Sequence, residues 1–469
     1  MQRIEFGTDG IRGIVGTWPW HKPIIMRIGQ ALGEFIQLRS NSGCAVIGRD
    51  TRASGADYLS DLSTGLMGQG VNVINLGIMT TPGVAFLTKR FKADLGIIVS
   101  ASHSSLEYNG IKLVGMNGLR LQQEEENEIE SIINKFIEIQ PKFSDVLGQE
   151  TNADHLGNVY IDDHVRHCPV SSLEGLKLIL DCAHGAASKL APEIFRKLGA
   201  EIIVINDKLN GNNINYHAGS EHVRAYPDEL VNKLHQTDTE YGFAFDGDGD
   251  RLVVVDRGGR VFDGQDLLFI LALHYKKLGH LRNDTIVTTR LSNLGFEESL
   301  LEHGINVTYA DKGDKNLEAA MWGGNFVLGG EIGGNLLIND GYHTAADAVY
   351  TSLALASVIV QNKGTISLRS IADQIIKRPQ KLISFTIFKT FSKAQLTKIE
   401  IEIERLRQEL GKGSRILFWG SATEHNVYRI LAEGERQNAQ EEVDKAAAAG
   451  KQFIEHVASE TLFFSTSQD

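Results

Sequence analysis

Apolar residues occur in short runs that recur in a fixed order, and three blocks of the chain share that order. Each block begins with a run typical of a buried strand that ends in a polar loop containing Gly or Ser. A helical stretch follows, and glycine then opens a second strand. The first strands are CAVIGRDTRASG (44–55), LILDCAHGAAS (178–188) and TIVTTRLSNLG (285–295); the second are GVNVINLG (70–77), GAEIIVIND (199–207) and GINVTYADKG (304–313).

A third apolar run in each block ends in the most unusual loop of that block. These ends are GIIVSASHSS (96–105), YGFAFDGDGDR (241–251) and NFVLGGEIGGN (325–335). Strand, helix and strand at this spacing is the βαβ unit, which predicts parallel strands with helices on the faces of the sheet. Ligands bind beyond the carboxyl ends of such strands, where all three loops lie. A coincidence of spacing in a Gly-rich α/β protein is the alternative.

The last quarter of the chain follows another pattern. Residues 394–410 predict an amphipathic, charged helix, 413–421 and 426–435 predict two strands, and 440–457 predict a long helix. This order predicts a smaller α+β domain at the end of the chain. We expect the break before it near 372–388, where RPQKLISF leaves the preceding helix.

Composition narrows the class of protein. The 469 residues are too many for one hydrophobic core, and the formal net charge of -12 argues against non-specific nucleic-acid binding. The 3 cysteines show no C-x-x-C pair, which favours free thiols in a reducing compartment. The N-terminus lacks the pattern of a signal peptide, and the most apolar runs (267–273 and 352–360) are too short to span a bilayer. We expect a cytoplasmic protein with no membrane or nucleic-acid partner.

The run FDGDGDR (245–251) is the strongest candidate for chemistry. It places Asp246, Asp248 and Asp250 at alternate positions, with glycines that let the backbone fold tightly around one hard divalent cation. An EF-hand does not fit, because Arg257 stands where its bidentate Glu would be. A solvated acidic turn is the plainer alternative. Arg251 beside the carboxylates suits a site that also binds an anion.

The Ser-rich loop raises the question of which serine is a nucleophile. Three carboxylates, Mg²⁺ and a serine make a workable set for phosphoryl transfer, since the metal neutralises the phosphate and the serine oxygen receives it. The chain contains neither G-x-x-x-x-G-K-[ST] nor G-x-S-x-G, which argues against an ordinary NTPase and against the hydrolase nucleophile elbow.

Six motifs in this order resemble the α-D-phosphohexomutases over essentially the whole chain. They are FGTDGIRG (6–13), GRDTRASG (48–55), SASH…NGIK (100–112), DCAHGA (181–186), FDGDGDR (245–251) and GGE (329–331). The resemblance implies an α/β fold of three related mixed α/β domains with sheets flanked by helices, plus a smaller C-terminal α+β domain, around one central cleft. We expect domains for the phosphoserine loop, the metal, the sugar and the phosphate at 1–150, 151–255, 256–372 and 373–469.

The resemblance also assigns roles to residues. Ser102, which precedes His103, is implied to be the phosphoserine, and its phosphate is implied to hold one Mg²⁺ together with Asp246, Asp248 and Asp250. It gives its phosphoryl group to a hexosamine 6-phosphate, forms a 1,6-bisphosphate and regains the other phosphate. The implied catalytic residues beside it are Arg12, Lys112 and, as an alternative acid or base, His103.

Lys112 would need a depressed pKa to act as a base at neutral pH. In the segment 48–55, Arg49 and Arg52 are implied to support the catalytic loop, and Asp181 and His184 to organise another loop. Substrate contacts are implied for Arg251, Lys312, Asp314, Glu331, Gly333 and Asn335, and phosphate contacts for Ser421, Thr423 and Arg429.

Three loops depart from the family pattern. Ser104 and Ser105 replace the usual Asn-Pro, which should loosen the catalytic loop unless packing compensates. The sugar loop E-x-S-G-H is EIGGN here (331–335), and the phosphate loop R-x-S-G-T-E-P is WGSATEH (419–425). The chemistry is therefore predicted more firmly than the sugar.

We expect an isomerase that interconverts glucosamine 6-phosphate and glucosamine 1-phosphate, with Mg²⁺ and a hexose or hexosamine 1,6-bisphosphate activator. The alternatives are a phosphomannomutase or phosphoglucomutase, and a non-catalytic sugar-phosphate binder. The expected partners are small sugar phosphates, and the protein is expected to be a monomer or a homodimer.

Overall fold

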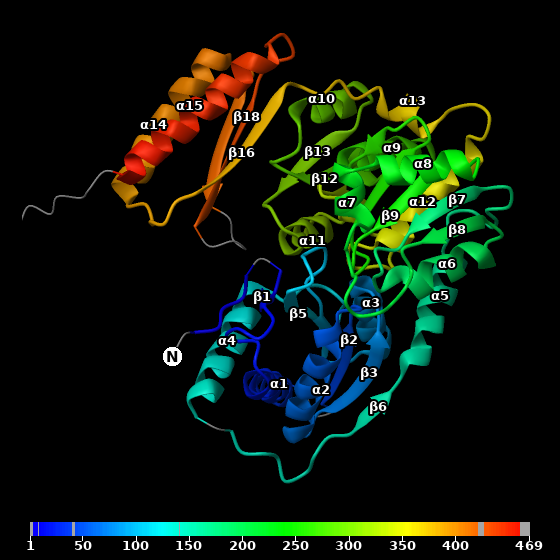
Figure 1. Ribbon diagram of the computed structural model, residues 1–469, viewed down its shortest axis with the longest axis vertical. Helices are drawn as coiled ribbons and strands as arrows, with labels where there is room; N and C mark the ends of the chain where they lie inside the picture. Colours follow the sequence, from blue (N-terminus) through cyan, green and yellow to red (C-terminus); the bar gives the residue numbers. More distant parts are fainter. Residues whose placement is uncertain (1–2, 8, 40–42, 140, 421–425, 460–469) are drawn as a thin grey trace, which may run out of the picture. The chain divides into compact units, whose positions relative to one another are not determined.

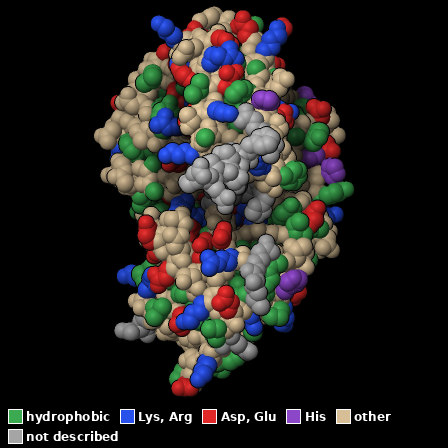
Figure 2. Space-filling view, turned by 90° about the vertical axis from the view of Figure 1, so that its left-hand side faces the viewer, with side chains coloured by type: hydrophobic (Ala, Val, Ile, Leu, Met, Phe, Trp, Pro, Cys, Tyr) green, Lys and Arg blue, Asp and Glu red, His purple; other side chains and the backbone are tan. Residues whose placement is uncertain are grey.

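The computed structural model describes residues 3–7, 9–39, 43–139, 141–420 and 426–459. The chain divides into two compact units, Met1–Ser292 with Leu300–Gln374 and Asn293–Ser299 with Ile375–Asp469. Figure 1 shows the helices lying against the sheets of the first unit. On the face in Figure 2, basic and acidic side chains are mixed rather than gathered into a basic area.

The first sheet has the order β1-β5-β4-β2-β3-β6, in which β2, β3, β4 and β6 are parallel and β5 is antiparallel to β4 and β1. Its alternating buried side chains, Ile47, Ile97 and Ile111 among them, share a core with the helices. The strands are β1 (Ile11–Ile14), β2 (Cys44–Arg49), β3 (Asn72–Ile78), β4 (Leu95–Val99), β5 (Tyr108–Gly115) and β6 (Glu150–Asn152), and the helices are α1 (Lys22–Gln37), α2 (Ala53–Gly68), α3 (Thr81–Phe91) and α4 (Gln123–Glu138).

The second sheet has the order β11-β10-β9-β7-β8, with β7, β8 and β9 parallel and β10 antiparallel to β9. Both β9 and β10 are buried along their whole length, which holds the loop between them rigidly. The elements are η1 (Asp154–Leu156), α5 (Gly157–Arg166), β7 (Lys177–Asp181), α6 (Ala187–Lys197), β8 (Glu201–Ile205), α7 (Gly219–Ala225), α8 (Asp228–Gln236), β9 (Tyr241–Phe245), β10 (Leu252–Asp256) and β11 (Val261–Phe262).

The third sheet has the order β13-β12-β14-β15, with β12, β13 and β14 parallel and β15 antiparallel to β14. Asp263 begins α9 by accepting hydrogen bonds from the amides of Gln265 and Asp266. The elements are α9 (Gly264–Lys277), η2 (Arg282–Asp284), β12 (Thr285–Thr289), α10 (Leu294–Glu302), β13 (Asn306–Ala310), α11 (Asp314–Gly323), β14 (Leu328–Gly330), β15 (Leu336–Ile338), α12 (Ala348–Gln361) and α13 (Leu368–Ala372).

The repeat expected from the sequence is confirmed by the strand order. The strands β4-β2-β3, β9-β7-β8 and β14-β12-β13 are neighbours in the same arrangement. In each case the third strand turns back into an antiparallel partner, β5, β10 or β15. The three unusual loops are therefore the turns between these strand pairs, and they lie at the carboxyl ends of parallel strands.

The second compact unit contains an antiparallel sheet of order β16-β18-β17. Its helices α14 and α15 contribute Ile399, Ala447 and Ile454 to a core with Ile430 of the sheet. The sequence did not predict β16, because most of its side chains are exposed and its alternation is weak. The elements are β16 (Gln380–Thr386), α14 (Lys393–Leu410), β17 (Arg415–Gly420), β18 (Val427–Glu433) and α15 (Gln440–Ser459).

The domain boundaries stay predictions, but the sheets extend past two of them. Strand β6 pairs with β3 beyond residue 150, and β11 pairs with β10 beyond residue 255. The sequence pattern does not show which sheet a short edge strand joins, so element and domain limits differ by a few residues. Within the described residues, no helix is both long and apolar enough to cross a membrane.

Candidate active site

The turn between β9 and β10 holds the three aspartates in one buried loop. Asp246, Asp248 and Asp250 are at most 3% exposed. Oδ1 of Asp246 accepts hydrogen bonds from the amides of Gly249, Asp250 and Arg251 at 3.1–3.2 Å, which folds the loop around this carboxylate. Gly249 has φ +75°, a backbone conformation that glycine adopts without steric cost.

The Ser-rich turn between β4 and β5 places one serine against the aspartates. Oγ of Ser102 donates to Oδ2 of Asp246 at 2.6 Å, and the residue is buried with φ +51°. Ser100 lies on the other side of the turn, where its Oγ donates to Asp50 at 2.7 Å and accepts from the Ser102 amide at 2.8 Å. Ser102 is thus oriented toward the aspartate loop, and Ser100 supports it.

Arg52 supports the Ser-rich turn through hydrogen bonds to its backbone carbonyls. This fully buried side chain pairs with Asp50 at 3.0 Å and donates to the carbonyls of Ser102, Ser104 and Ser105 at 2.6–3.0 Å. The guanidinium offers several donors in a rigid fork, so it fixes several carbonyls at once. These hydrogen bonds restrain the turn in which Ser104 and Ser105 stand in place of the usual Asn-Pro.

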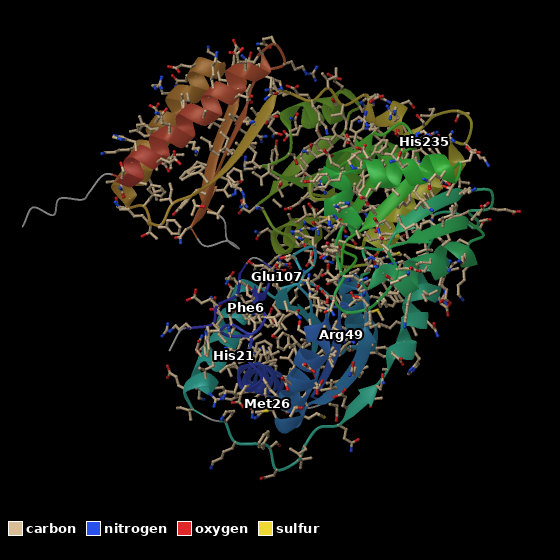
Figure 3. All side chains as sticks on the ribbon, in the orientation of Figure 1. Phe6, His21, Met26, Arg49, Glu107 and His235 are labelled. Atoms are coloured by element: carbon tan, nitrogen blue, oxygen red, sulfur yellow. The ribbon has the colours of Figure 1, made fainter. Side chains whose placement is uncertain are left out.

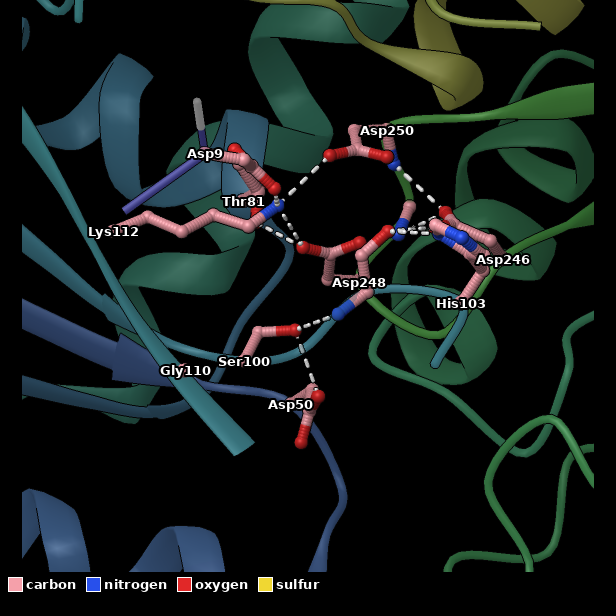
Figure 4. Close-up of polar contacts among 12 residues, drawn as sticks. Asp9, Asp50, Thr81, Ser100, His103, Gly110, Lys112, Asp246, Asp248 and Asp250 are labelled. Carbon is pink, nitrogen blue, oxygen red and sulfur yellow. Dashed lines mark hydrogen bonds and ion pairs between the residues drawn. The ribbon is translucent and has the colours of Figure 1, made fainter. Parts of the chain in front are cut away.

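Lys112 projects from β5 into the aspartates (Figure 4). Its Nζ lies 2.9 Å from Asp248, 3.1 Å from Asp250 and 3.1 Å from Asp9, and the side chain is fully buried. Burial alone would lower the pKa of Lys112, but the three carboxylates raise it above its usual value. These carboxylates therefore do not give Lys112 the depressed pKa that a lysine base needs. A charged Lys112 instead suits the neutralisation of negative charge.

Asp9 is a site residue that the sequence analysis did not single out. It accepts from Arg12 at 2.7 Å and from Arg120 at 2.8 Å, and it also contacts Lys112. Burial would raise the pKa of Asp9, but the neighbouring Lys112, Arg120 and Arg12 lower it to about 2. Its charge keeps the Arg12 and Lys112 side chains together.

His103 lies beside the candidate nucleophile. Its Nδ1 is 3.3 Å from Oγ of Ser102. Burial, followed by the charges of Arg251 and Arg12, lowers its pKa to about 2. The imidazole is therefore neutral at physiological pH, and it serves as a hydrogen-bonding group rather than as an imidazolium.

The aspartate loop has the donor set for a divalent cation. One carboxylate oxygen from each of Asp246, Asp248 and Asp250 lies within 4.8 Å of the other two. Oδ1 of Asp248 is buried and has no hydrogen-bond partner, while its Oδ2 accepts from Thr81 at 2.6 Å. Burial and the two neighbouring carboxylates raise the pKa of Asp246, because they destabilise its ionised form. A bound cation would remove this destabilisation. These residues fit Mg²⁺, which prefers such hard oxygen ligands.

The sugar loop and the turn before α11 are joined by a hydrogen bond. Oε1 of Glu331 accepts from the amide of Gly313 at 3.0 Å. In the same turn the carbonyl of Lys312 accepts from the side chain of Asn316, at 2.9 Å. Burial and the nearby Asp250, Asp9 and Glu331 carboxylates raise the pKa of Asp314 to about 7.

The altered part of the sugar loop packs against the aspartate loop. Nδ2 of Asn335 donates to Oδ1 of Asp250 at 3.3 Å, and the Asn335 backbone bridges to Arg251. Arg224 donates to the carbonyl of Gly333 at 2.8 Å. The structure therefore brings Asn335 to the predicted metal loop, while Gly333 is bonded to Arg224.

Arg251 lies beside the carboxylates of Glu221 and Asp250. Its side chain is 3.5 Å from Glu221 and 3.9 Å from Asp250, and its buried Nε has no hydrogen-bond partner. Burial would lower its pKa, but Asp250 and Asp246 raise it, so the cation persists.

The predicted phosphate-binding residues are described only in part. Ser421 and Thr423 lie outside the described residues. Arg429 lies on β18, opposite Ser384 of β16 and Trp419 of β17.

Five further residues belong to the site or its support, and sequence reasoning missed their roles. Short motifs contain some of them: Asp9 lies in TDGIRG, Asp50 in GRD and Thr81 in TTPG, so these motifs were the available signal. Nothing in the local pattern marks the others as site residues, because their partners are remote in sequence. The five are Asp9, Asp50, Thr81, Arg120 and Arg224.

Similarity to known proteins covers most of the chain. The family domains described as phosphoglucomutase/phosphomannomutase alpha/beta/alpha domains I, II and III match residues 3–139, 158–259 and 263–378. The chain therefore belongs to the phosphoglucomutase/phosphomannomutase family, which confirms the resemblance and the fold class.

Its relatives include proteins of one particular activity. Phosphoglucosamine mutase of Clostridioides difficile is 37% identical over 439 residues, covering 93% of this chain and 96% of that protein. Phosphoglucosamine mutase of Magnetococcus marinus is 35% identical over 434 residues, covering 92% and 88%. These relatives do not favour the phosphomannomutase, phosphoglucomutase or non-catalytic alternatives.

Solved structures show the same fold at low sequence identity. A phosphoglucomutase/phosphomannomutase family protein from Burkholderia thailandensis has a TM-score of 0.78 and 22% identity, covering 96% of this chain and 97% of that one. N-acetylphosphoglucosamine mutase of Aspergillus fumigatus, in complex with GlcNAc-6P and magnesium, has a TM-score of 0.65 and 14% identity, covering 98% and 96%.

Arg52→Met is expected to lower the free energy of unfolding by about 3–5 kcal/mol, because it leaves Asp50 buried without its partner. Arg49→Met is the matched control. Arg49 is half-buried and donates to a single carbonyl at 3.0 Å, so we expect a loss of about 1 kcal/mol. Urea unfolding of both variants measures the difference, and equal losses would contradict the role given to Arg52.

Asp248→Asn is expected to weaken Mg²⁺ binding by more than about 100-fold, since it removes the charge of a carboxylate with an unpartnered oxygen. Calorimetric titration of the full chain with Mg²⁺ measures this. The exposed Asp238→Asn is the control and should bind as the unmodified protein does. Unchanged binding in Asp248→Asn would exclude the aspartate loop as the metal site.

Proposed function

We propose that this protein interconverts glucosamine 6-phosphate and glucosamine 1-phosphate through a phosphoserine at Ser102 and a 1,6-bisphosphate intermediate. The observation that carries the proposal is the 2.6 Å hydrogen bond between Ser102 Oγ and Asp246, in a loop of three buried aspartates. The named relatives, phosphoglucosamine mutases at 35–37% identity, support the choice of sugar.

Different residues of this chain have different roles in the proposed phosphoryl transfer. The Ser102 oxygen carries the phosphoryl group; its bond to phosphorus breaks as a sugar hydroxyl oxygen bonds to phosphorus. The proton that the sugar hydroxyl loses is balanced by the one that the released Ser102 oxygen gains, so serine leaves as a hydroxyl. Lys112 and Arg12, held together by Asp9, neutralise charge on the phosphoryl oxygens. Mg²⁺, held by the three aspartates and Ser102, would supply further charge neutralisation when bound.

His103 and Arg52 keep the nucleophile in position. The neutral His103 ring and Asp246 are both within hydrogen-bond reach of Ser102 Oγ, so they restrict its rotamer. Arg52 fixes the carbonyls around it. Positioning of this kind supplies much of the rate in phosphoryl transfer, because the reacting oxygens must be aligned.

Substrate recognition is assigned to the loops around the aspartates. Glu331 offers a carboxylate to sugar hydroxyls, and Arg251, Lys312 and Asp314 lie on neighbouring turns with Gly333 and Asn335. Ser421, Thr423 and Arg429 are assigned to the non-transferring phosphate by family resemblance. A hexose or hexosamine 1,6-bisphosphate would load Ser102 and so activate the enzyme.

The intact mass of the purified protein is expected to show one phosphoryl group, located at Ser102 by peptide analysis. Ser102→Ala should lose this group and at least about 1,000-fold in kcat, as expected when a nucleophile is removed. Ser105→Ala is the matched control, because Ser105 is exposed and contacts Arg52 through its backbone carbonyl. A protein that carries no phosphate and cannot be loaded by a 1,6-bisphosphate would refute the catalytic proposal.

The choice of sugar is tested by a substrate panel with Mg²⁺ and bisphosphate activator. We expect kcat/KM for glucosamine phosphate to exceed that for glucose and mannose phosphates by about tenfold or more, equivalent to one hydrogen-bonding group recognised in the transition state. A preference for glucose or mannose phosphate would contradict the sugar assignment while leaving the phosphoserine chemistry in place.

A further inference from the structure

A second buried cluster of histidines and carboxylates lies apart from the residues used above. It joins α5, the segment 339–347 and the first turn of α12 (teal and yellow in Figure 1). Asp163, His164 and His343 each offer one ligand atom, and these atoms lie within 4.8 Å of one another. All three residues are at most 6% exposed.

His343 presents an unpartnered nitrogen to an unpartnered oxygen. Its Nδ1 is 2.9 Å from Oδ2 of Asp340, and it must donate because a carboxylate only accepts. In a neutral imidazole, Nε2 then carries a lone pair. This nitrogen lies 3.9 Å from Oδ2 of Asp163, and both atoms are buried without a hydrogen-bond partner. The separation is too long for a hydrogen bond.

Oδ2 of Asp163 accepts no hydrogen bond, although another histidine, His167, lies near it. Nδ1 of His167 lies 3.2 Å from Oδ2 of Asp163, but its hydrogen bond, at 3.0 Å, is to the Asp163 backbone carbonyl. A buried carboxylate oxygen without a hydrogen-bond partner is costly, so a cation or a hydrogen-bond donor at this position would stabilise it.

His164 is held between two acceptors. Its Nδ1 is 3.0 Å from the carbonyl of Tyr160, and its Nε2 is 3.1 Å from Oδ2 of Asp347. A neutral imidazole has one N–H, which leaves one of these contacts without a hydrogen. Oδ2 of Asp347 already accepts from the Tyr160 hydroxyl at 2.8 Å.

The charges of the cluster lead to the same conclusion. Asp163, Asp340 and Asp347 are three carboxylates, and Lys89 is the neighbouring ammonium, bonded to the carbonyls of residues 341 and 342 at 3.2 Å. With neutral histidines, these four side chains sum to two negative charges. One divalent cation would neutralise them, as two added protons on the histidines would.

We propose that Asp163, His164 and His343 bind a divalent transition-metal ion of the Zn²⁺ class, at a site distinct from the aspartate loop. Zn²⁺ lies about 2.0–2.2 Å from nitrogen and oxygen ligands, so an ion between His343 Nε2 and Asp163 Oδ2 can reach both. The two imidazoles favour Zn²⁺ over Mg²⁺, which prefers oxygen ligands.

The surroundings of the ligands suit this assignment. Asp340 accepts from Nδ1 of His343 and thereby presents Nε2 toward the ion, the usual arrangement of a carboxylate behind a metal-binding histidine. Tyr350 stacks on the His343 ring with centroids 3.9 Å apart and restricts its rotation. A bound ion would tie α5, which follows the first sheet, to the segment before α12.

The test uses the full chain, freed of metal by chelation and kept in saturating Mg²⁺ so that the aspartate loop is occupied. Titration with Co²⁺ is expected to give visible absorption bands that saturate at one equivalent, and Zn²⁺ should displace Co²⁺ and raise the Tm. Asp248→Asn should keep these bands, because its substitution lies in the other site.

His343→Asn is the decisive variant, since the asparagine amide can still donate to Asp340 but offers no nitrogen lone pair. It should bind Co²⁺ at least tenfold more weakly, and Asp163→Asn should do the same. His235→Asn is the control. His235 is exposed on α8 (Figure 3), so this variant should bind Co²⁺ as tightly as the unmodified chain does. Circular dichroism verifies that each variant is folded.

Two outcomes would overturn the proposal. The first is Co²⁺ binding that is unchanged in His343→Asn and Asp163→Asn. The second is the absence of saturable Co²⁺ binding by the unmodified chain in saturating Mg²⁺. Mutase activity in His343→Asn is expected to persist, so failure here is distinguishable from failure of the proposed function.

Discussion

Burial of negative charge is the constraint on which the rest of the active site depends. Three aspartates in one buried turn are stable only if positive groups approach them, because an isolated buried carboxylate would be protonated or would destabilise the fold. Lys112 of the first sheet meets this demand by contacting Asp248 and Asp250 of the second. The same contact brings the Ser-rich turn to the aspartate loop, so charge compensation and catalytic geometry have one cause.

A second buried ion pair stabilises the nucleophile's turn. Arg52 pairs with Asp50 and donates to several carbonyls, which leaves few backbone oxygens of the turn unsatisfied. The turn therefore keeps Ser102 at φ +51° without the proline expected there. Several hydrogen bonds from one buried guanidinium thus restrain the carbonyls of Ser104 and Ser105 in this turn.

The repeated strands and the turn residues could be read from the sequence, because local periodicity decides them. The third strands end where expected, at Val99, Phe245 and Gly330. Strand β16 was missed, since its side chains are mostly exposed. Arg120 was missed for another reason: its partner Asp9 is 111 residues away, and Arg120 itself does not stand in an unusual local pattern.

The sequence alone determined the three repeats and the aspartate loop, because each depends on neighbouring residues in the chain, and its family resemblance singled out Ser102 as the candidate nucleophile. Only the tertiary structure decided which charges are buried and which partners they meet. It showed that Arg52, which the resemblance implies supports the catalytic loop, is fully buried and bonded to the carbonyls of that loop, and it brought Asp163 next to His343. Charge burial is a property of packing between distant segments, and no local pattern specifies it.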